Sequence, residues 1–123
     1  MVGDTELLDM LASETTRRSE TLIAGIQELS ASGQPDPEKV EQLRVDAHGI
    51  KGAAMVVGQE RLAELARLIE DALAARAESG QIEPDLANNI VGAVNALHEA
   101  TQAVAKGADE PPAVAESLRA LGG

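Results

Sequence analysis

The chain contains no phenylalanine, tyrosine, tryptophan or cysteine. Its core must therefore be built from aliphatic side chains alone, and disulfides, thiolate metal sites and cysteine nucleophiles are excluded. The 22 alanines and 14 leucines far outnumber the 9 valines and 6 isoleucines. This balance favours helices over strands, because alanine and leucine are strong helix formers whereas β-branched residues prefer strands. The composition predicts an all-α fold.

Length and charge narrow the classes of function. A chain of 123 residues is the size of one domain. The net charge of −11 argues against nucleic acid or an anionic membrane as a partner, and the lack of aromatic rings excludes base stacking. The longest uncharged apolar stretch, residues 86–97, is too short to span a bilayer, and no signal-peptide pattern opens the chain. We expect a cytoplasmic domain.

Proline and glycine divide the chain into helical segments. Asp36-Pro37-Glu38 combines an N-cap residue, a proline at the first helical position and a first-turn acid, and Glu83-Pro84-Asp85 repeats this signature. Gly58, Gly80 and Gly107 stand where helices are expected to end. The expected helices cover residues 4–32, 36–57, 59–79 and 84–106, followed by a short helix from about 112 to 121.

Each of the four long segments carries aliphatic residues at helical spacing. The stripe of the first segment is weakest in its middle, where Thr15, Arg18 and Ser19 interrupt it. Four amphipathic helices with short connections predict an antiparallel four-helix bundle over residues 1–107. Residues 108–123 are then a tail that serves as a linker, a short capping helix or both. Because four helices can close one core, we expect the isolated domain to be a monomer.

His48 is the residue that a purely structural bundle does not explain. At 100° per residue it lies well over 90° from the centre of the apolar stripe of its helix, on the flank or solvent side. Arg44 and Lys51, one turn away on either side, could neutralise a phosphate on its ring. Gly52 lies beside it and leaves the imidazole uncovered, although glycine inside a helix costs about 1 kcal/mol relative to alanine. An ordinary surface histidine followed by lysine is the competing interpretation.

The following helix offers a partner for His48. The two helices run antiparallel around a turn near Gly58, so a residue ten positions before the turn faces one about ten positions after it. That window holds Arg67, Glu70 and Asp71, and Glu70 lies on the flank of the apolar stripe. A carboxylate that accepts a hydrogen bond from one ring nitrogen fixes the tautomer and leaves the other nitrogen nucleophilic.

The residues around His48 resemble a known family. The stretch Ala47-His48-Gly49-Ile50-Lys51-Gly52-Ala53-Ala54, then Gly58 and a leucine-rich helix with Leu68-Ile69-Glu70, resembles the histidine phosphotransfer (HPt) family over about residues 5–105. It looks most like the P1 domain of CheA-type chemotaxis histidine kinases. The resemblance implies that His48 is the phospho-acceptor, that Lys51 stabilises the phosphoryl group and that Glu70 orients the imidazole, while Gly52 clears space for a receiver domain.

Two positions depart from the family's pattern. Arg67 stands where CheA-type domains often carry a second histidine, so part of that hydrogen-bond network is altered, and we expect Arg67 to touch phosphate or an acidic residue of the partner instead. Gly49 stands where threonine or serine is common, which removes a hydroxyl and adds local helix flexibility. His98 has no lysine or arginine three or four residues later and is expected to be an ordinary, partly packed histidine.

The resemblance also implies partners. The ATPase domain of a histidine kinase, or a phosphorylated receiver, would supply the phosphoryl group, and an aspartate of a CheY-like response regulator would accept it. ATP and Mg²⁺ would belong to those partner domains, with no cofactor or metal on this chain. Outward-facing apolar residues of the second helix could dock a receiver, or could be scattered surface residues of no special use. The expected partner-binding residues are Arg44, Val45, Gly52, Met55, Val56 and Arg67.

Two other classes of function compete with the phosphocarrier. For an enzyme, the chain lacks a P-loop, a G-x-G-x-x-G motif and a Ser-His-Asp arrangement in a recognisable context, and it is too short to include a kinase ATPase domain. It could still be the first domain of a kinase whose catalytic domain lies elsewhere. A helical adaptor that binds a receiver or a kinase domain without phosphotransfer is the second alternative, and the presence of His48, Lys51 and Gly52 disfavours it.

Overall fold

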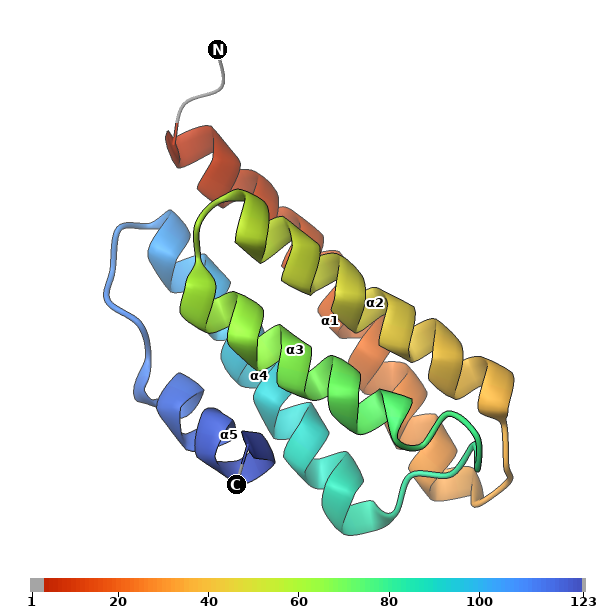
Figure 1. Ribbon diagram of the computed structural model, residues 1–123. Helices are drawn as coiled ribbons and strands as arrows, with labels where there is room; N and C mark the ends of the chain where they lie inside the picture. The colour runs from red at the N-terminus through yellow and green to blue at the C-terminus, as the bar shows by residue number, and fades with distance from the viewer. Residues whose placement is uncertain (1–3, 123) are drawn as a thin grey trace.

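The computed structural model describes residues 4–122, which fold into five α-helices and no strand (Figure 1). Helices α1 to α4 run up and down in turn, and each packs on its two neighbours, with α4 closing the ring against α1. The expected all-α bundle with a short C-terminal helix is confirmed. The helices are α1 (Asp4–Ser32), α2 (Pro37–Val56), α3 (Glu60–Ala74), α4 (Pro84–Ala105) and α5 (Pro112–Gly122).

Most helix boundaries follow from local signals. The Asp36 side chain caps α2 by accepting a hydrogen bond from the backbone N–H of Lys39 at 3.1 Å. The third helix is shorter than expected, because it ends at Ala74 and not near residue 79. The backbone there turns so that the carbonyl of Gly80 can accept a hydrogen bond from the N–H of Asp36 at 2.9 Å. The end of α3 is therefore followed by a contact between two loops, made at a glycine with a φ of +70°.

The core is aliphatic, as the composition requires, and it runs along the axis of the bundle. The stripe of α1 is not interrupted in the way that the sequence suggests. Thr15 and Ser19 are buried, and they continue the apolar face of α1 between Leu11 and Leu22. The hydroxyls of both residues have no hydrogen-bond partner among residues 4–122. The sequence predicted an interruption here because both residues are polar. They are buried because of their position around the helix, and not because of their side-chain type.

Replacing Thr15 by valine is expected to raise the free energy of unfolding by about 1 kcal/mol, because a buried hydroxyl without a partner costs free energy that a methyl group does not. Thr16 is the matched control. Its hydroxyl donates to the carbonyl of Ala12 at 2.9 Å and also contacts His98 and Gln102. Thr16→Val should therefore lower stability by about 1 kcal/mol. Urea denaturation measures both, and a destabilised Thr15→Val variant would contradict the argument.

Helix α5 lies across α3 and α4 (Figure 1). Val114 is fully buried in that contact, and Arg61 of α3 forms an ion pair with Glu110 just before α5, with Nε to Oε1 at 2.9 Å. The tail thus includes a helix that covers one side of the bundle and leaves α2 uncovered.

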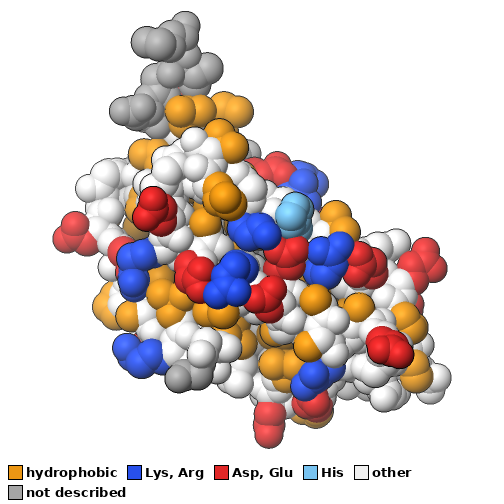
Figure 2. All heavy atoms as spheres, in the orientation of Figure 1, with side chains coloured by type: hydrophobic (Ala, Val, Ile, Leu, Met, Phe, Trp, Pro, Cys, Tyr) orange, Lys and Arg blue, Asp and Glu red, His pale blue; other side chains and the backbone are white. Residues whose placement is uncertain are grey.

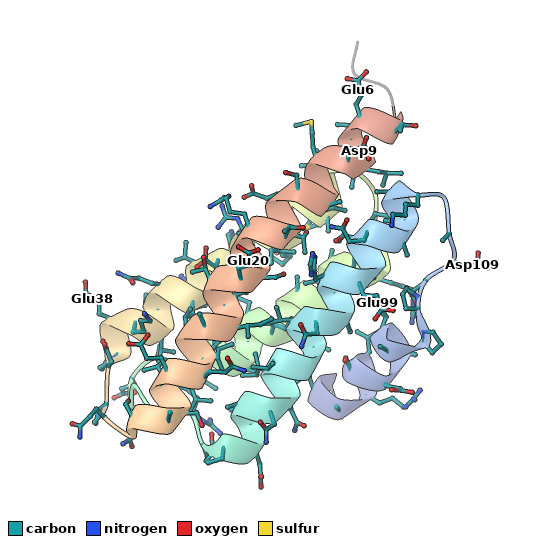
Figure 3. All side chains as sticks on the ribbon, turned by 180° about the vertical axis from the view of Figure 1, so that it is seen from behind. Glu6, Asp9, Glu20, Glu38, Glu99 and Asp109 are labelled. Carbon is teal, nitrogen blue, oxygen red and sulfur yellow. The ribbon has the colours of Figure 1, made fainter. Side chains whose placement is uncertain are left out.

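Acidic side chains are spread over the molecule as seen from behind. The carboxylates labelled in Figure 3 belong to α1, to the first turn of α2, to α4 and to the connection before α5. The acidic residues labelled in that view are Glu6, Asp9, Glu20, Glu38, Glu99 and Asp109.

None of the helices within residues 4–122 combines the length and the apolar character needed to cross a membrane.

Candidate functional site

His48 projects from the middle of α2 into solvent. Its neighbours Ala47 and Ile50 are buried and hold this part of α2 against the core. The His48 side chain is 59% exposed. Figure 2 shows a histidine on the face formed by α2 and α3, with cationic and anionic side chains gathered beside it. The helix therefore presents the imidazole on a rigid element while leaving it open to a large partner.

Glu70 of α3 is the centre of the charged group beside His48. Its side chain is only 10% exposed, and it lies on the side of α3 that packs against α2. Its Oε2 lies 3.0 Å from Nδ1 of His48 and accepts a hydrogen bond from Nη1 of Arg44 at 2.9 Å. Its Oε1 lies 2.8 Å from Nζ of Lys51. One carboxylate thus holds three nitrogen groups from α2, and it pins the histidine ring from one side.

The charge state of Glu70 decides which nitrogen of His48 is nucleophilic. Burial raises the pKa of Glu70, but the hydrogen bonds and charges of Lys51 and His48 outweigh that effect and hold the pKa below its ordinary value. An ionised carboxylate can only accept hydrogen bonds. The Nδ1 of His48 must therefore carry the proton that it donates to Glu70, which leaves a free lone pair on Nε2. This arrangement suits a nucleophile that accepts a group at Nε2.

The two cations near His48 are both tied to Glu70, and Arg44 also pairs with Glu41 at 2.6 Å. The hydrogen bond to Glu41 is the largest influence that raises the pKa of Arg44, so this residue keeps its charge. Lys51 has a single carboxylate partner among the described residues, on a flexible stem. Lys51 is therefore the cation that can move more easily to a new anion.

Gly52 and Gly49 open the surface of α2 beside His48. No atom lies within 4 Å of where a Cβ at Gly52 would stand, so this position is bare backbone facing solvent. Gly49 is different. A Cβ there would stand 2.5 Å from Cζ and 2.8 Å from Nε of Arg18, which reaches over from α1. The sequence indicated a missing hydroxyl and local flexibility at Gly49, and it did not indicate the contact with Arg18. The one sequence feature that could have indicated this contact is the position of Arg18 within the interrupted apolar stripe of α1.

A family model for the Hpt domain matches residues 6–107, which is most of the chain. The chain belongs to the Hpt domain family. Domains of this family are phosphocarriers and not enzymes, and they work with kinases and the receivers of response regulators in phosphorelays. A search of curated proteins found no match.

Arg67 has partners within its own Hpt domain. It pairs with Glu64 one turn before it and with Asp71 one turn after it, the latter at 2.6 Å. Arg67 makes no hydrogen bond with His48 or Glu70. The antiparallel window placed Arg67 and Glu70 together, but the rotation of α3 turns only Glu70 toward α2. The sequence predicted that Arg67 touches phosphate or an acidic residue of a partner. In the structure of the domain alone, Arg67 forms ion pairs with Glu64 and Asp71.

Exposed apolar side chains surround His48 on the Hpt surface. Val45, Met55 and Val56 of α2 are 50%, 62% and 79% exposed, and Met10 of α1, which the sequence did not single out, is 62% exposed. Among the described residues these four are the exposed large hydrophobic side chains, and all of them lie on α1 or α2. A groove of about 340 Å³ runs between the two helices, lined by Leu7, Met10, Leu11, Glu14, Gly49, Ala53, Val56 and Val57.

His98 differs from His48 in its exposure and in the group that contacts its ring. It is half-buried between α1 and α4, and its Nε2 lies 2.9 Å from Oγ1 of Thr16. That hydroxyl already donates its proton to the carbonyl of Ala12, so it accepts from His98. Within residues 4–122, no three histidine or acidic side chains gather in a way that could bind a metal ion.

The lowered pKa of Glu70 predicts how this part of the Hpt domain responds to acid. Because the folded pKa lies below the unfolded one, ionised Glu70 stabilises the fold fully above the unfolded pKa, and that contribution is lost as the pH falls through the folded value. At pH 7 the native chain should exceed Glu70→Gln by about 1–2 kcal/mol in unfolding free energy. The difference should shrink below about pH 4.3. Urea denaturation at pH 7 and pH 3 measures it, and a pH-independent difference would contradict the assignment.

Proposed function

We propose that His48 is the phospho-acceptor of this Hpt domain. It receives a phosphoryl group from the ATPase domain of a histidine kinase or from a phosphorylated receiver, and passes it to an aspartate of a CheY-like receiver domain. The observation that carries the proposal is the Nδ1 contact with buried Glu70 at 3.0 Å, which leaves Nε2 exposed and unprotonated. His98 is less open to a partner, because it is half-buried between α1 and α4 and has no carboxylate that holds its ring as Glu70 holds His48.

The chemistry is an in-line displacement at phosphorus. The Nε2 lone pair of His48 forms the N–P bond while the P–O bond to the donor breaks, and the donor oxygen leaves with the bonding electrons. The ring, which keeps its proton on Nδ1, becomes positively charged, and Glu70 stabilises that charge. Transfer onward reverses these roles: a carboxylate oxygen of the receiver aspartate attacks phosphorus, and the N–P bond electrons return to Nε2.

Lys51 and Gly52 complete the acceptor. Lys51 moves from Oε1 of Glu70 to the phosphoryl oxygens. It can do so because it lies one helical turn after His48 on α2. Bare backbone at Gly52 allows the partner's aspartate to approach in line. Mg²⁺ and ATP are held by the partner domains, where they neutralise most of the charge on the transferring group.

The subfamily proposal rests on the sequence of α3. The run Leu68-Ile69-Glu70-Asp71-Ala72-Leu73 is similar to the P1 domain of CheA-type kinases, and this favours a cytoplasmic chemotaxis-type pathway. Arg67 replaces the second histidine of that pattern and forms ion pairs with Glu64 and Asp71. The hydrogen-bond network around Glu70 therefore contains Arg44 and Lys51 instead.

The receiver docks on the exposed apolar residues of α1 and α2. The four exposed large hydrophobic side chains lie on two adjacent helices, and two of them, Met10 and Val56, line a groove of about 340 Å³ that also includes Gly49 beside His48. This exceeds what scattered surface residues explain. Burying this surface would also exclude water from the transferring group.

Val56→Glu is expected to slow transfer from phosphorylated His48 to a receiver by about 10-fold, because it puts a charge at the centre of an apolar interface. Ala120→Glu on α5 adds the same charge at an exposed site on another face and should leave transfer unchanged. Rapid-quench measurement of the loss of label from phosphorylated His48 gives the transfer rate of each variant. Equal rates for the two variants would place the docking surface elsewhere.

The acceptor itself is tested by labelling. The purified chain is incubated with Mg-ATP and a CheA-type kinase ATPase domain, then with receivers, and acid-labile, base-stable phosphate is measured. Native chain and His98→Gln should take the label and pass it on, whereas His48→Gln should take none. Label that survives in His48→Gln would overturn His48 as the acceptor. Failure of a correctly folded native chain with kinase, phosphorylated receivers and phosphoramidate alike would favour the adaptor function instead.

A further inference from the structure

Arg18 of α1 reaches over the backbone of α2 next to His48, where it lies against Gly49. Its Nε donates to Glu14 one turn before it, and its Nη1 donates to Oδ1 of Asp46 on α2 at 3.0 Å. The side chain is 22% exposed, so most of it is packed between the helices while one edge meets solvent. Its Nη2 makes no hydrogen bond with any of residues 4–122.

Gly49 is what allows Arg18 to lie there. A Cβ at this position would stand 2.5 Å from Cζ and 2.8 Å from Nε and Nη1 of Arg18, closer than side chains pack. The guanidinium therefore occupies the space that the side chain of the residue after His48 would otherwise fill. Glycine in the middle of a helix costs about 1 kcal/mol relative to alanine, and at Gly49 that cost makes room for a cation.

The tautomer of His48 sets the direction in which its nucleophilic nitrogen points. Nδ1 is held by Glu70 of α3, and the two nitrogens of an imidazole point to nearly opposite sides of the ring. Nε2 must therefore point away from α3. Helix α2 packs between α3 and α1, so the side opposite Glu70 is the side of α1. That side carries Gly52, whose backbone is bare, and Gly49, which Arg18 covers.

The other two cations near His48 start from the α3 side of the ring. Both Arg44 and Lys51 bind Glu70 there. A phosphoryl group on Nε2 would lie toward α1, where Arg18 is a cation packed against α2. The free Nη2 edge of Arg18 supplies two N–H donors there, in the planar geometry that suits phosphate oxygens.

We propose that Arg18 contacts the phosphoryl group on His48, with Gly49 providing the space for it, so that the phosphate is held between Lys51 from the α3 side and Arg18 from the α1 side. This inference rests on the proposed function, because it assumes phosphorylation of Nε2. It assigns to α1, beyond its part in the docking surface, a direct part in binding the transferred group.

The test uses phosphoramidate, a small donor that needs no docking surface. Nε2 forms a bond to phosphorus, the P–N bond of the donor breaks, and ammonia leaves. Arg18→Gln should label about 10-fold more slowly than native chain, as expected for the loss of one charge-assisted hydrogen bond. Arg17→Gln is the matched control, since Arg17 is a 64% exposed neighbour that pairs with the same Glu14. It should label within about twofold of native chain. Equal rates for the two variants would overturn the role of Arg18.

A second measurement observes Arg18 itself. In the native chain, NMR signals of the guanidinium N–H groups of Arg18 should shift and exchange more slowly once His48 is phosphorylated, whereas those of Arg17 should not. Gly49→Ala should lose the Arg18 shift and label as slowly as Arg18→Gln, although alanine is the better helix former. An unchanged Arg18 signal in fully phosphorylated chain would overturn the inference and leave the proposed function intact. A native chain that takes no label at His48 would overturn both.

Discussion

Replacing Glu70 by glutamine is expected to slow phosphorylation of His48 by about 10- to 100-fold, the usual effect of removing the group that orients a functional histidine. Two physical effects combine. An amide bears no charge to stabilise the cationic ring that forms as Nε2 bonds to phosphorus. It also offers N–H donors, which can pair with an unprotonated Nδ1 and so favour the tautomer with the proton on Nε2. Initial rates of labelling by phosphoramidate measure the effect without a partner.

Glu64→Gln provides the control for this experiment. Glu64 is a carboxylate on the same helix that also binds an arginine, Arg67, but it makes no contact with His48. Its substitution should leave the labelling rate within about twofold of the native value. If Glu70→Gln and Glu64→Gln label at the same rate, the hydrogen bond from Nδ1 does not prepare His48 for attack. Circular dichroism of each variant establishes that the bundle is intact.

Replacing Gly80 by alanine is expected to lower the free energy of unfolding by about 2–4 kcal/mol. Gly80 has a φ of +70°, a conformation that disfavours any residue with a Cβ. A Cβ there would also stand 2.5 Å from the backbone nitrogen of Pro37 and 2.6 Å from that of Asp36. Backbone atoms cannot move aside as a flexible side chain can, so the hydrogen bond between the Gly80 carbonyl and Asp36 would be strained or broken.

Gly58→Ala separates the two causes of that loss. Gly58 has a nearly identical φ of +76°, but no atom lies within 4 Å of where its Cβ would stand. Its substitution should cost only the conformational penalty of about 1 kcal/mol. Urea denaturation of both variants measures the difference. Equal losses would show that the close contact between the two loops contributes little. Phosphorylation of His48 in folded Gly80→Ala should be unchanged, because Gly80 lies at the opposite end of α3 from the turn that leads out of α2.

Local signals in the sequence predicted most of the fold and half of the candidate site. Asp36 and Pro37 start α2, and Gly58 follows its end, as their backbone and capping preferences require. The 100° spacing of the apolar stripe placed His48 outward and Gly52 beside it. The antiparallel register around the turn near Gly58 brought Glu70 into reach of His48, because a short connection leaves few ways to align two helices.

Features that depend on contacts between distant segments were decided only by the tertiary structure. Thr15 and Ser19 are buried, although they are polar, because the rotation of α1 against its neighbours turns that face inward. The third helix ends early, and Gly80 in the loop that follows it meets Asp36. Arg18 crosses to Gly49 because α1 and α2 pack at one particular register. The periodicity of each helix fixes which face is apolar, but the relative rotation and offset of two helices follow from side-chain packing across their interface. The sequence by itself thus singled out His48 as the proposed acceptor and predicted its bundle, whereas the packing of α1 on α2 decided that Arg18 lies against Gly49 beside it.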